Sequence, residues 1–492
     1  MNLPVLSADA VRAAERQFPE ARDSGLLMQR AATAVATECL TILKDSGGVV
    51  GRHVLLLLGP GDNGGDAAFA GARLAQRGAA VFALPVADRV HEEGSRALRV
   101  AGARMVDVDG ALALFDRVDL VIDGIVGLGS SRALTGTAAL MARAITDARI
   151  FTVAIDVPSG VDTDTGAVPG VAIEADITIT FGGLRRAHVI APAALNCGEV
   201  LVADIGVPMR SLDIAITGEG HWFDPPRPDA DKYARGVVGV VTGSRTYPGA
   251  ALLSTGAATH SGCGMVRYFG SAKDDVVAAH PEVVAAGRST IGSSQRTAAW
   301  LVGCGMGLDR KAVEALHTVL DMRAPVVVDA DAITLIGREK TLRAALLARR
   351  ESGDLTLLTP HAGEAARLAA ALGLSIDLEA DRLRAAKLLA RSLSCLVLLK
   401  GPSTLITDGA NFIATPLLGA RLATAGSGDV LAGLVAGAAA RWAAQAAFGP
   451  REFMELAGAS ALRHAAAAGV ADITASDLLV GLADASSATM AP

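Results

Sequence analysis

The chain has 492 residues, too many for one ordinary domain at ~100 to 200 residues each, so two large domains are expected. Its 45 basic and 51 acidic residues give a formal net charge of -6 without a long basic run, which argues against nucleic-acid binding. Five scattered cysteines form no CxxC pair, so we expect neither zinc nor disulfides and predict a cytoplasmic protein. We expect no signal peptide, because the first residues show no basic region followed by an apolar core, and no membrane span, because the apolar run after Asp429 is broken at Arg441.

The first half alternates apolar strands with helical stretches. Ser7 can cap a helix through Val11 and Glu15, and helical spacing also marks residues 26–36 and 67–76. Strands are predicted at 53–58, 81–86, 119–126, 151–155 and 177–181. This order predicts an open, mainly parallel α/β sheet, that is, a Rossmann-like three-layer domain.

Three polar clusters follow strands of this predicted sheet: 62–66 in GPGDNGGD, 123–132, and 156–162 in DVPSGVD. Ligands bind beyond the carboxyl ends of parallel strands, so we expect the clusters to converge. Asn63, Asp123 and Ser159 offer hard oxygen ligands, which suit an alkali or alkaline-earth cation better than zinc. Taken singly, each carboxylate is also typical of a capped turn, and GPGDNGGD lacks both the dinucleotide fingerprint and the Walker lysine.

As a set, GPGDNGGDA, DGIVGLGSSR, DVPSGVD and TFGGLR resemble the motifs of the NAD(P)H-hydrate epimerases, from the N-terminal helices to about Pro208. The resemblance implies a potassium ion held by Asn63, Asp123 and Ser159, and Asp156 as a catalytic, substrate-binding group beside the reacting ring. The residues that it implies for contact with the hydrated nucleotide are Asp62, Asn63, Gly64, Gly65, Asp66 and the stretch from Gly127 to Arg132.

Three residues depart from the pattern of that family. Asp62 replaces an Asn, Ala67 replaces a Gly, and Arg185 stands where the family commonly has Lys. Arginine does not readily give up its proton, so Arg185 could bind phosphate or polarise an oxygen but is a poor acid–base substitute. The first half could therefore instead be a nucleotide-sensing or oligomerisation module.

The segment WFDPPRPDADK separates the two halves, and its three prolines exclude a helix or a central strand. We therefore expect a domain at 1–220, a linker at 221–231 and a second domain at 232–492. Strands predicted at 236–241, 265–269, 300–303, 325–328, 355–358, 395–399 and 404–407, with a helix over 249–258, make the second domain α/β as well.

The stretch TAGSGDVLAG, residues 424–433, joins a glycine turn, one carboxylate and a helix start. Gly426 and Gly428 allow a tight turn, and a helix over 430–440 would direct its N-terminal amides at an anion such as phosphate. Asp429 at this point is well placed as a base for a hydroxyl that attacks a phosphoryl group. Asp is equally a favoured helix cap, so the stretch alone leaves both roles open.

Further motifs end the other predicted strands of this half: VGCGMGLD, VVVDADAIT, LTPHAGE and LLKGPSTLI. Together with LATAGSGDVLAG they resemble the ADP- or ATP-dependent NAD(P)H-hydrate dehydratases, a branch of the ribokinase-like fold, from about Lys232 to Leu482. The residues implied for the adenine nucleotide are Lys400, Gly401, Pro402, Ser403, Thr404 and Gly428. Those implied for the hydrated nucleotide are Ala250, Gly307, His361 and Asp429, and Glu364 is implied to help organise Mg2+.

The two resemblances predict a bifunctional repair enzyme that acts on hydrated NADH and NADPH with ADP or ATP. Its first domain would interconvert the R and S forms, and Asp429 would activate the hydroxyl of the S form for phosphorylation and elimination. We also expect a homo-oligomer. The alternative is a ribokinase-like small-molecule kinase with an N-terminal nucleotide-binding module, because the Asp429 loop does not distinguish stable phosphorylation from phosphorylation with elimination.

Overall fold

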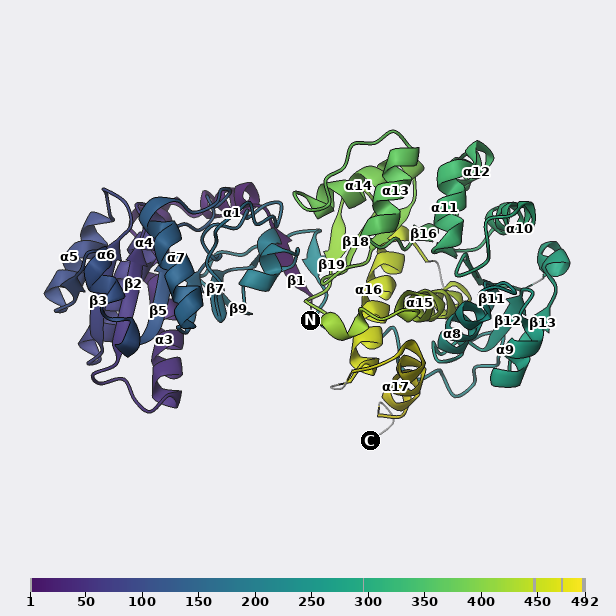
Figure 1. Cartoon of the computed structure of the whole chain (residues 1–492), viewed down its shortest axis with the longest axis horizontal. Coiled ribbons are helices and arrows are strands. Elements are labelled where there is room, and N and C mark those ends of the chain that lie inside the picture. The colour runs from purple at the N-terminus through teal and green to yellow at the C-terminus, as the bar shows by residue number, and fades with distance from the viewer. Residues whose placement is uncertain (1, 295, 446–447, 470–471, 489–492) are drawn as a thin grey trace. The chain divides into compact units, whose positions relative to one another are not determined.

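The computed structural model describes residues 2–294, 296–445, 448–469 and 472–488 (Figure 1). It divides into two compact units. The N-terminal unit comprises Leu3–Asp213 with Glu379–Arg382, and the C-terminal unit comprises Met1–Asn2, Ile214–Leu378 and Leu383–Pro492. Each unit contains a sheet whose strands are mostly parallel, which confirms the predicted α/β class.

The sheet of the N-terminal unit has the strand order β4-β3-β2-β5-β6-β7-β9, and its strands all run parallel. The strands of this unit are β1 (Leu3–Leu6), β2 (His53–Leu58), β3 (Ala80–Pro85), β4 (Arg104–Met105), β5 (Val118–Gly124), β6 (Thr152–Ile155), β7 (Ile177–Phe181), β8 (Leu184–Arg185) and β9 (Glu199–Ala203). The chain builds outward from β2 to β4 and then returns to the other side of β2 with β5. Such an order reversal is where ligands bind in open parallel sheets.

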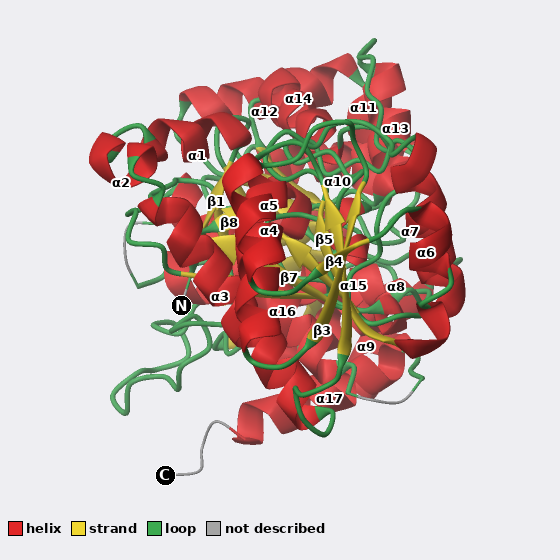
Figure 2. Ribbon diagram, turned by 90° about the vertical axis from the view of Figure 1, so that its left-hand side faces the viewer, coloured by secondary structure: helices red, strands yellow, loops and turns green. Residues whose placement is uncertain are grey.

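Helices pack on both faces of this sheet because successive residues of a strand point to opposite faces. Leu56 and Leu58 of β2 belong to one buried cluster, whereas Leu55 and Leu57 belong to the cluster on the other face. The helices are α1 (Ala8–Glu15), α2 (Pro19–Asp23), α3 (Leu26–Asp45), α4 (Asp62–Gln76), α5 (Glu92–Val100), α6 (Val108–Leu112) and α7 (Gly136–Ala148). Figure 2 shows these helices in red and the strands in yellow.

Two helices of this unit bear on the predictions. By length and composition α3 could cross a bilayer, but its residues Leu27, Val35 and Leu43 are buried in the core, where α3 packs beside α4. Helix α4 begins at Asp62, five residues before the predicted start at Ala67. Glycine costs ~1 kcal/mol in a helix, which favoured a turn for GPGDNGGD, yet its last five residues, 62–66, form the start of the helix. Asn63 is thereby placed at the order reversal.

The C-terminal sheet has the order β13-β12-β11-β14-β15-β16-β17-β18-β19-β10. Strand β18 is antiparallel to both neighbours, and the other pairs are parallel. The strands are β10 (Ile214–Ala215), β11 (Val237–Val241), β12 (Met265–Phe269), β13 (Val284–Ala286), β14 (Ala299–Val302), β15 (Val326–Val328), β16 (Thr356–Leu358), β17 (Leu396–Leu399), β18 (Leu405–Thr407) and β19 (Phe412–Ala414). The order reverses again, here between β11 and β14.

A buried helix, α15 (Ser427–Ala443), packs against this sheet and against α8 and α16, and Val430–Ala440 are buried without a break. The other helices are α8 (Pro248–Thr259), α9 (Lys273–Ala279), α10 (Arg310–Leu320), α11 (Asp331–Arg338), α12 (Lys340–Glu351), α13 (Ala362–Ala371), α14 (Arg382–Leu393), α16 (Pro450–Ala467) and α17 (Ala475–Ala488). The segment predicted as a linker contributes Trp222 and Phe223 to the core of this unit, and Trp442 Nε1 donates a hydrogen bond to the Trp222 carbonyl at 3.0 Å.

Candidate active sites

Oxygen-bearing side chains meet at the order reversal of the N-terminal sheet. Asp123, near the end of β5, accepts hydrogen bonds from Ser159 Oγ at 2.7 Å and from the Ser159 backbone N–H at 2.8 Å. Asn63 Nδ2 donates to the Ile155 carbonyl at 2.7 Å. A Cβ added at Gly127 would come within 2.2 Å of Asn63 Oδ1, so this close approach requires glycine. The structure thus joins Asp123 to Ser159 and places Asn63 against Gly127.

Both residues of the Asp123–Ser159 pair are fully buried. Burial raises the pKa of Asp123 to about 6, although the hydrogen bonds from Ser159 and Ile125 act in the opposite direction. A cation bound here would offset the cost of the buried negative charge.

Asp156 follows β6 with a left-handed backbone, φ 65°, which Asp tolerates better than most residues. Its Oδ1 accepts a hydrogen bond from Thr180 Oγ1 at 3.0 Å and pairs with Arg185 Nη2 at 3.0 Å. The Arg185 side chain is 2% exposed and also donates to the carbonyls of Gly183 and Phe181. Arg185 is therefore the buried counter-ion of Asp156.

His188 hydrogen-bonds to both Arg185 and Asp156. Sequence reasoning missed it, because a single histidine after TFGGLR belongs to no motif. Its Nδ1 accepts a hydrogen bond from the Arg185 backbone N–H at 3.0 Å, so Nε2 carries the proton and donates to the Asp156 carbonyl at 2.7 Å. Burial lowers the pKa of His188 to about 4, so the ring is neutral at neutral pH. His188 fixes the turn that bears Asp156.

Two further carboxyl groups belong to this cluster. Asp66 is buried, and its Oδ1 has no hydrogen-bond partner among the described residues. Burial, together with the charges of Asp62, Asp156 and Glu15, raises the pKa of Asp66 well above its usual range. Burial also raises the pKa of Glu15, which Arg185 opposes. Glu15 was missed because it was predicted only as part of a packing helix.

A cavity of about 480 Å³ opens beyond the ends of β2, β3 and β5. Arg132 gives it a positive charge, Ser130 and Ser131 give it hydroxyl groups, and Val86 and Ile125 give it apolar walls. Gly127 and residues 62–66 are not part of its lining. Of the predicted nucleotide contacts in this unit, the residues from Gly129 to Arg132 are therefore the ones that reach this cavity.

In the C-terminal unit, Asp429 is the third residue of α15. The N-cap of this helix is Gly426, with a left-handed backbone at φ 86°, and not Asp429. The capping role that the sequence left open for Asp429 is therefore wrong. The Ser427 N–H donates to the Thr424 carbonyl at 3.3 Å, whereas the N–H groups of Gly428 and Asp429 precede the first i→i−4 bond of the helix, and they give this position the partial positive charge of a helix start.

Asp429 belongs to a compact polar cluster in which Cys304 Sγ and one oxygen each of Asp329 and Asp429 lie within 4.8 Å of one another. Asp329 Oδ1 accepts hydrogen bonds from Thr359 Oγ1 at 2.7 Å and from Lys400 Nζ at 2.8 Å. Asp329 Oδ2 accepts one from Cys304 Sγ at 3.5 Å. These residues follow β14, β15, β16 and β17, so four neighbouring strand ends build the cluster.

The charges of the cluster act on each other. Burial raises the pKa of Asp429 to about 7, and the negative charge of Asp329 adds to the rise. Burial and Asp329 also raise the pKa of Cys304 well above its usual range, so this thiol stays protonated and can donate. Burial acts to lower the pKa of Lys400, but Asp329 and Glu364 outweigh it and raise that pKa. Asp429 is thus a carboxyl group that can accept a proton near neutral pH.

The residues predicted to bind the adenine nucleotide differ in accessibility. Lys400 Nζ lies in the acidic cluster, where it would meet a Cβ added at Gly428 at 3.0 Å. Gly401 and Pro402 are exposed, whereas the Ser403 and Thr404 side chains are buried. The Thr404 backbone N–H donates to Thr415 Oγ1 at 3.0 Å.

The residues predicted to bind the hydrated nucleotide lie around this cluster. Ala250 of α8 packs against the loop after β14, where a Cβ added at Gly305 would come within 2.8 Å of Ala250 Cβ. In the same loop the Gly307 N–H donates to Asp331 Oδ2 at 2.9 Å. The loop that carries both Cys304 and Gly307 therefore approaches α8 closely at Gly305.

His361 caps α13 through Nδ1, which accepts a hydrogen bond from the Gly363 N–H at 3.1 Å. Glu364 completes the capping box by accepting from the His361 N–H at 2.9 Å. The Glu364 carboxylate also lies 4.0 Å from Lys400 Nζ, which connects this helix start to the Asp329 cluster. His361 therefore has a structural role at the edge of the site, with its imidazole half exposed.

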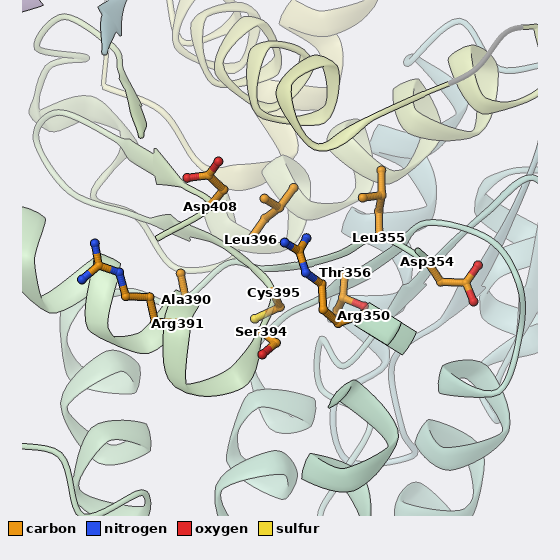
Figure 3. A pocket seen from close by; sticks show the side chains of 10 residues that line it. All are labelled: Arg350, Asp354, Leu355, Thr356, Ala390, Arg391, Ser394, Cys395, Leu396 and Asp408. Atoms are coloured by element: carbon orange, nitrogen blue, oxygen red, sulfur yellow. The ribbon is translucent and has the colours of Figure 1, made fainter. Parts of the chain in front are cut away.

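The cavity in Figure 3, of about 240 Å³, lies at the amino ends of strands of the C-terminal sheet, opposite the carboxyl ends that carry the polar cluster. Thr356 and Leu396, in its lining, begin β16 and β17, whereas Thr359 and Lys400 follow the ends of those strands. In Figure 3 the Arg350 side chain extends between Leu396 and Thr356, and the labelled lining residues include none of the polar cluster. This cavity is separate from the candidate site.

Comparisons with known proteins cover both units. A family model described as NAD(P)H-hydrate dehydratase matches residues 238–481, and one described as YjeF-related protein N-terminus matches residues 24–187. Among solved structures, an ADP/ATP-dependent NAD(P)H-hydrate dehydratase from Bacillus subtilis, co-crystallised with ATP and Mg2+, is 23% identical with a TM-score of 0.42, covering 55% of this chain and 97% of that one.

Several relatives match most of the chain. The bifunctional NAD(P)H-hydrate repair enzyme Nnr of Mycobacterium tuberculosis is 43% identical over 435 residues, which cover 87% of each chain. The protein of the same name from Corynebacterium glutamicum is 37% identical and covers 88% of this chain and 86% of its own length. Because these matches run through both units and both sites, the chain belongs to the family of bifunctional NAD(P)H-hydrate repair enzymes.

Proposed function

We propose that this chain repairs hydrated NADH and NADPH in two steps. The N-terminal unit interconverts the R and S forms, and the C-terminal unit dehydrates the S form with ADP or ATP. The observation that carries the proposal is the placement of Asp429, a partly buried base at the start of α15 in the cluster that holds Lys400. Family membership over both units supports the presence of two activities on one chain.

Hydration places a hydroxyl on the ring carbon next to nitrogen, and hydroxide is a poor leaving group. Asp429 takes the hydroxyl proton while the oxygen attacks the terminal phosphoryl group of the adenine nucleotide. Lys400 and the N–H groups at the start of α15 stabilise the negative charge of that group. The carbon–oxygen bond then breaks, phosphate leaves, and the neighbouring ring carbon loses a proton, which restores the ring double bond.

Epimerisation inverts the same carbon. The hydroxyl takes up a proton and departs as water, which leaves positive charge on the ring. Water then adds to the other face and gives up a proton, so the opposite epimer forms with no net change in protons. Asp156 supplies negative charge beside the ring, and Arg185 and Thr180 fix its side chain. Residues 62–66, Gly127 and Arg132 bind the nucleotide around it.

Two cations accompany these reactions in our proposal. The oxygen donors of Asn63, Asp123 and Ser159 fit a potassium ion, and the full burial of the Asp123 carboxylate favours a positive partner. Mg2+ accompanies the phosphates of the adenine nucleotide, with Glu364 as a nearby carboxylate. A homo-oligomeric, cytoplasmic protein stays a prediction for this chain.

The dehydration step is tested by incubating the purified S hydrate with Mg2+ and either ADP or ATP. We expect reduced nicotinamide nucleotide and inorganic phosphate in equal amounts. A phosphorylated hydrate that accumulates without recovery of the reduced ring would instead support the small-molecule kinase. Parallel assays with ADP and ATP identify the preferred phosphoryl donor.

A further inference from the structure

Asp329 is a buried carboxylate to which the proposed reaction gives no part. Its side chain is 2% exposed, and it lies directly after β15 and before Ala330, whose φ is positive at 49°. An unpaired charge buried to this extent would be strongly destabilising. Asp329 is paired by Thr359, Lys400 and Cys304, which come from three other strand ends.

Two of these three partners lie at the reacting groups. Lys400 Nζ lies against Gly428 in the first turn of α15, where the transferred phosphoryl group would bind. Cys304 Sγ lies within 4.8 Å of an oxygen of Asp429. The third partner, Thr359, anchors the Asp329 carboxylate from the end of β16. Asp329 therefore holds the Lys400 ammonium and the Cys304 thiol, and Thr359 fixes its carboxylate to the end of β16.

We infer that Asp329 is a positioning residue of the dehydration step, which holds the Lys400 ammonium at the first turn of α15 and the Cys304 thiol beside Asp429. The inference rests on the proposed function, because that function makes Asp429 the base. Asp329 itself touches neither the substrate nor the nucleotide in this account.

The charged groups around Asp429 make this role measurable. The titratable groups that face its end of α15 are Cys304 after β14, Asp329 after β15, Lys400 after β17, Glu364 on α13 and His464 on α16. His464 stays neutral because burial lowers its pKa to about 4. After burial itself, the Asp329 charge is the largest influence that raises the pKa of Asp429, and Lys400 opposes it.

Two substitutions should therefore move the titration of Asp429 in opposite directions. Asp329→Asn removes a negative charge and frees Lys400 to approach Asp429, so the pKa of Asp429 falls. Lys400→Gln removes the positive charge, so that pKa rises. A neighbouring charge typically shifts a carboxyl pKa by ~1 unit or more. The acidic limb of the dehydration rate should thus move about 1 pH unit down in Asp329→Asn and move up in Lys400→Gln.

The matched control is Thr359→Val, which removes one hydrogen bond to Asp329 but no charge. We expect a lower rate for this variant with the acidic limb unmoved. If Asp329→Asn lowers the rate at every pH and leaves the limb in place, Asp329 only supports the fold and the inference is wrong. If Asp329→Asn does not fold, the inference stands on Lys400→Gln, and an unmoved limb there overturns it.

A second readout does not depend on activity. The carboxyl carbon of Asp429 can be titrated by NMR in protein labelled at Asp side chains, with Asp429→Asn to assign the signal. We expect a midpoint near 7 in the wild type and a lower one in Asp329→Asn. If the wild type does not dehydrate the S hydrate, the proposed function is wrong. If the titration midpoint of Asp429 is the same in the wild type and in Asp329→Asn, only the inference is wrong.

Discussion

The sheets of the two units have a similar strand order, but the two sites differ in whether the proposed functional carboxylate lies in an ion pair. In each unit the strand order reverses once, between β2 and β5 or between β11 and β14, and the polar residues gather at the carboxyl ends of the strands. Each site also contains a buried ion pair at a strand end. In the N-terminal unit the pair is Asp156–Arg185, which includes the carboxylate that we propose beside the ring, whereas in the C-terminal unit the pair is Asp329–Lys400 and the proposed base, Asp429, stays outside it.

This difference follows the chemistry proposed for each site. A carboxylate that must stabilise positive charge on a ring benefits from a fixed position, and Arg185 supplies it. A general base works best with a pKa close to the operating pH, and burial raises the pKa of Asp429 to about 7. A full ion pair to Asp429 would lower that pKa again. The same topology therefore holds one carboxylate in an ion pair and keeps the other available for proton transfer.

Removal of the base should have the largest effect. Asp429→Asn should lower dehydration of the S hydrate by ~100 to 10,000-fold, because a general base contributes about that much. The fold and adenine-nucleotide binding should be kept, since Asp429 caps no helix. Epimerisation in the same preparation serves as the internal control. A variant that retains more than about a tenth of the wild-type rate would contradict the role of Asp429 as the general base.

Removal of the counter-ion at the other site should act on stability. Arg185→Ala leaves Asp156 buried without its partner, which typically costs ~3 to 5 kcal/mol of unfolding free energy. Arg185→Lys keeps the positive charge, so epimerisation should be preserved or increased. Denaturant unfolding and exchange of the R form without adenine nucleotide measure the two effects. Equal unfolding free energies for the Ala variant and the wild type would show that the Asp156–Arg185 pair is unimportant.

A substitution in the proposed cation site tests whether the two units act independently. Asp123→Ala leaves the N–H groups of Ser159 and Ile125 without their acceptor, at a typical cost of ~1 to 3 kcal/mol, although the Ser159 hydroxyl keeps the Val126 carbonyl. The substitution should also impair epimerisation. Dehydration of the pure S form should not change, because Asp429 lies in the other unit. Asp123→Asn, which keeps an acceptor oxygen, is the matched control and should lose less stability. A folded Asp123→Ala protein that loses both activities equally would contradict separate sites.

The smallest effect is expected where only the position of a cation changes. In Gly428→Ala the new Cβ would lie 3.0 Å from Lys400 Nζ, so the flexible end of Lys400 must shift. We expect dehydration to slow by roughly tenfold or less, below the ~100-fold that a 1 Å misplacement can cost. Gly287→Ala, whose Cβ would meet nothing closer than 3.8 Å, is the control and should leave the rate unchanged.

Sequence reasoning found the strand ends and the loops that carry the chemistry, because apolar runs and glycine-rich turns are local signals. It could not find the pairing of Lys400 with Asp329, which are 71 residues apart, or that of Arg185 with Asp156. Such contacts depend on strand order, which local patterns do not encode. Glu15 and His188 were missed for a different reason, since each belongs to a segment without a motif.

The account is tested most directly with a mixture of the R and S hydrates, Mg2+ and the preferred adenine nucleotide, followed through the absorbance of the reduced nicotinamide. If both units work as proposed, the wild type restores the whole pool faster than spontaneous epimer exchange, and Asp123→Ala stops after the S form is consumed. Recovery that halts at the S fraction in the wild type would contradict the epimerase assignment, and no recovery at all would contradict the dehydratase.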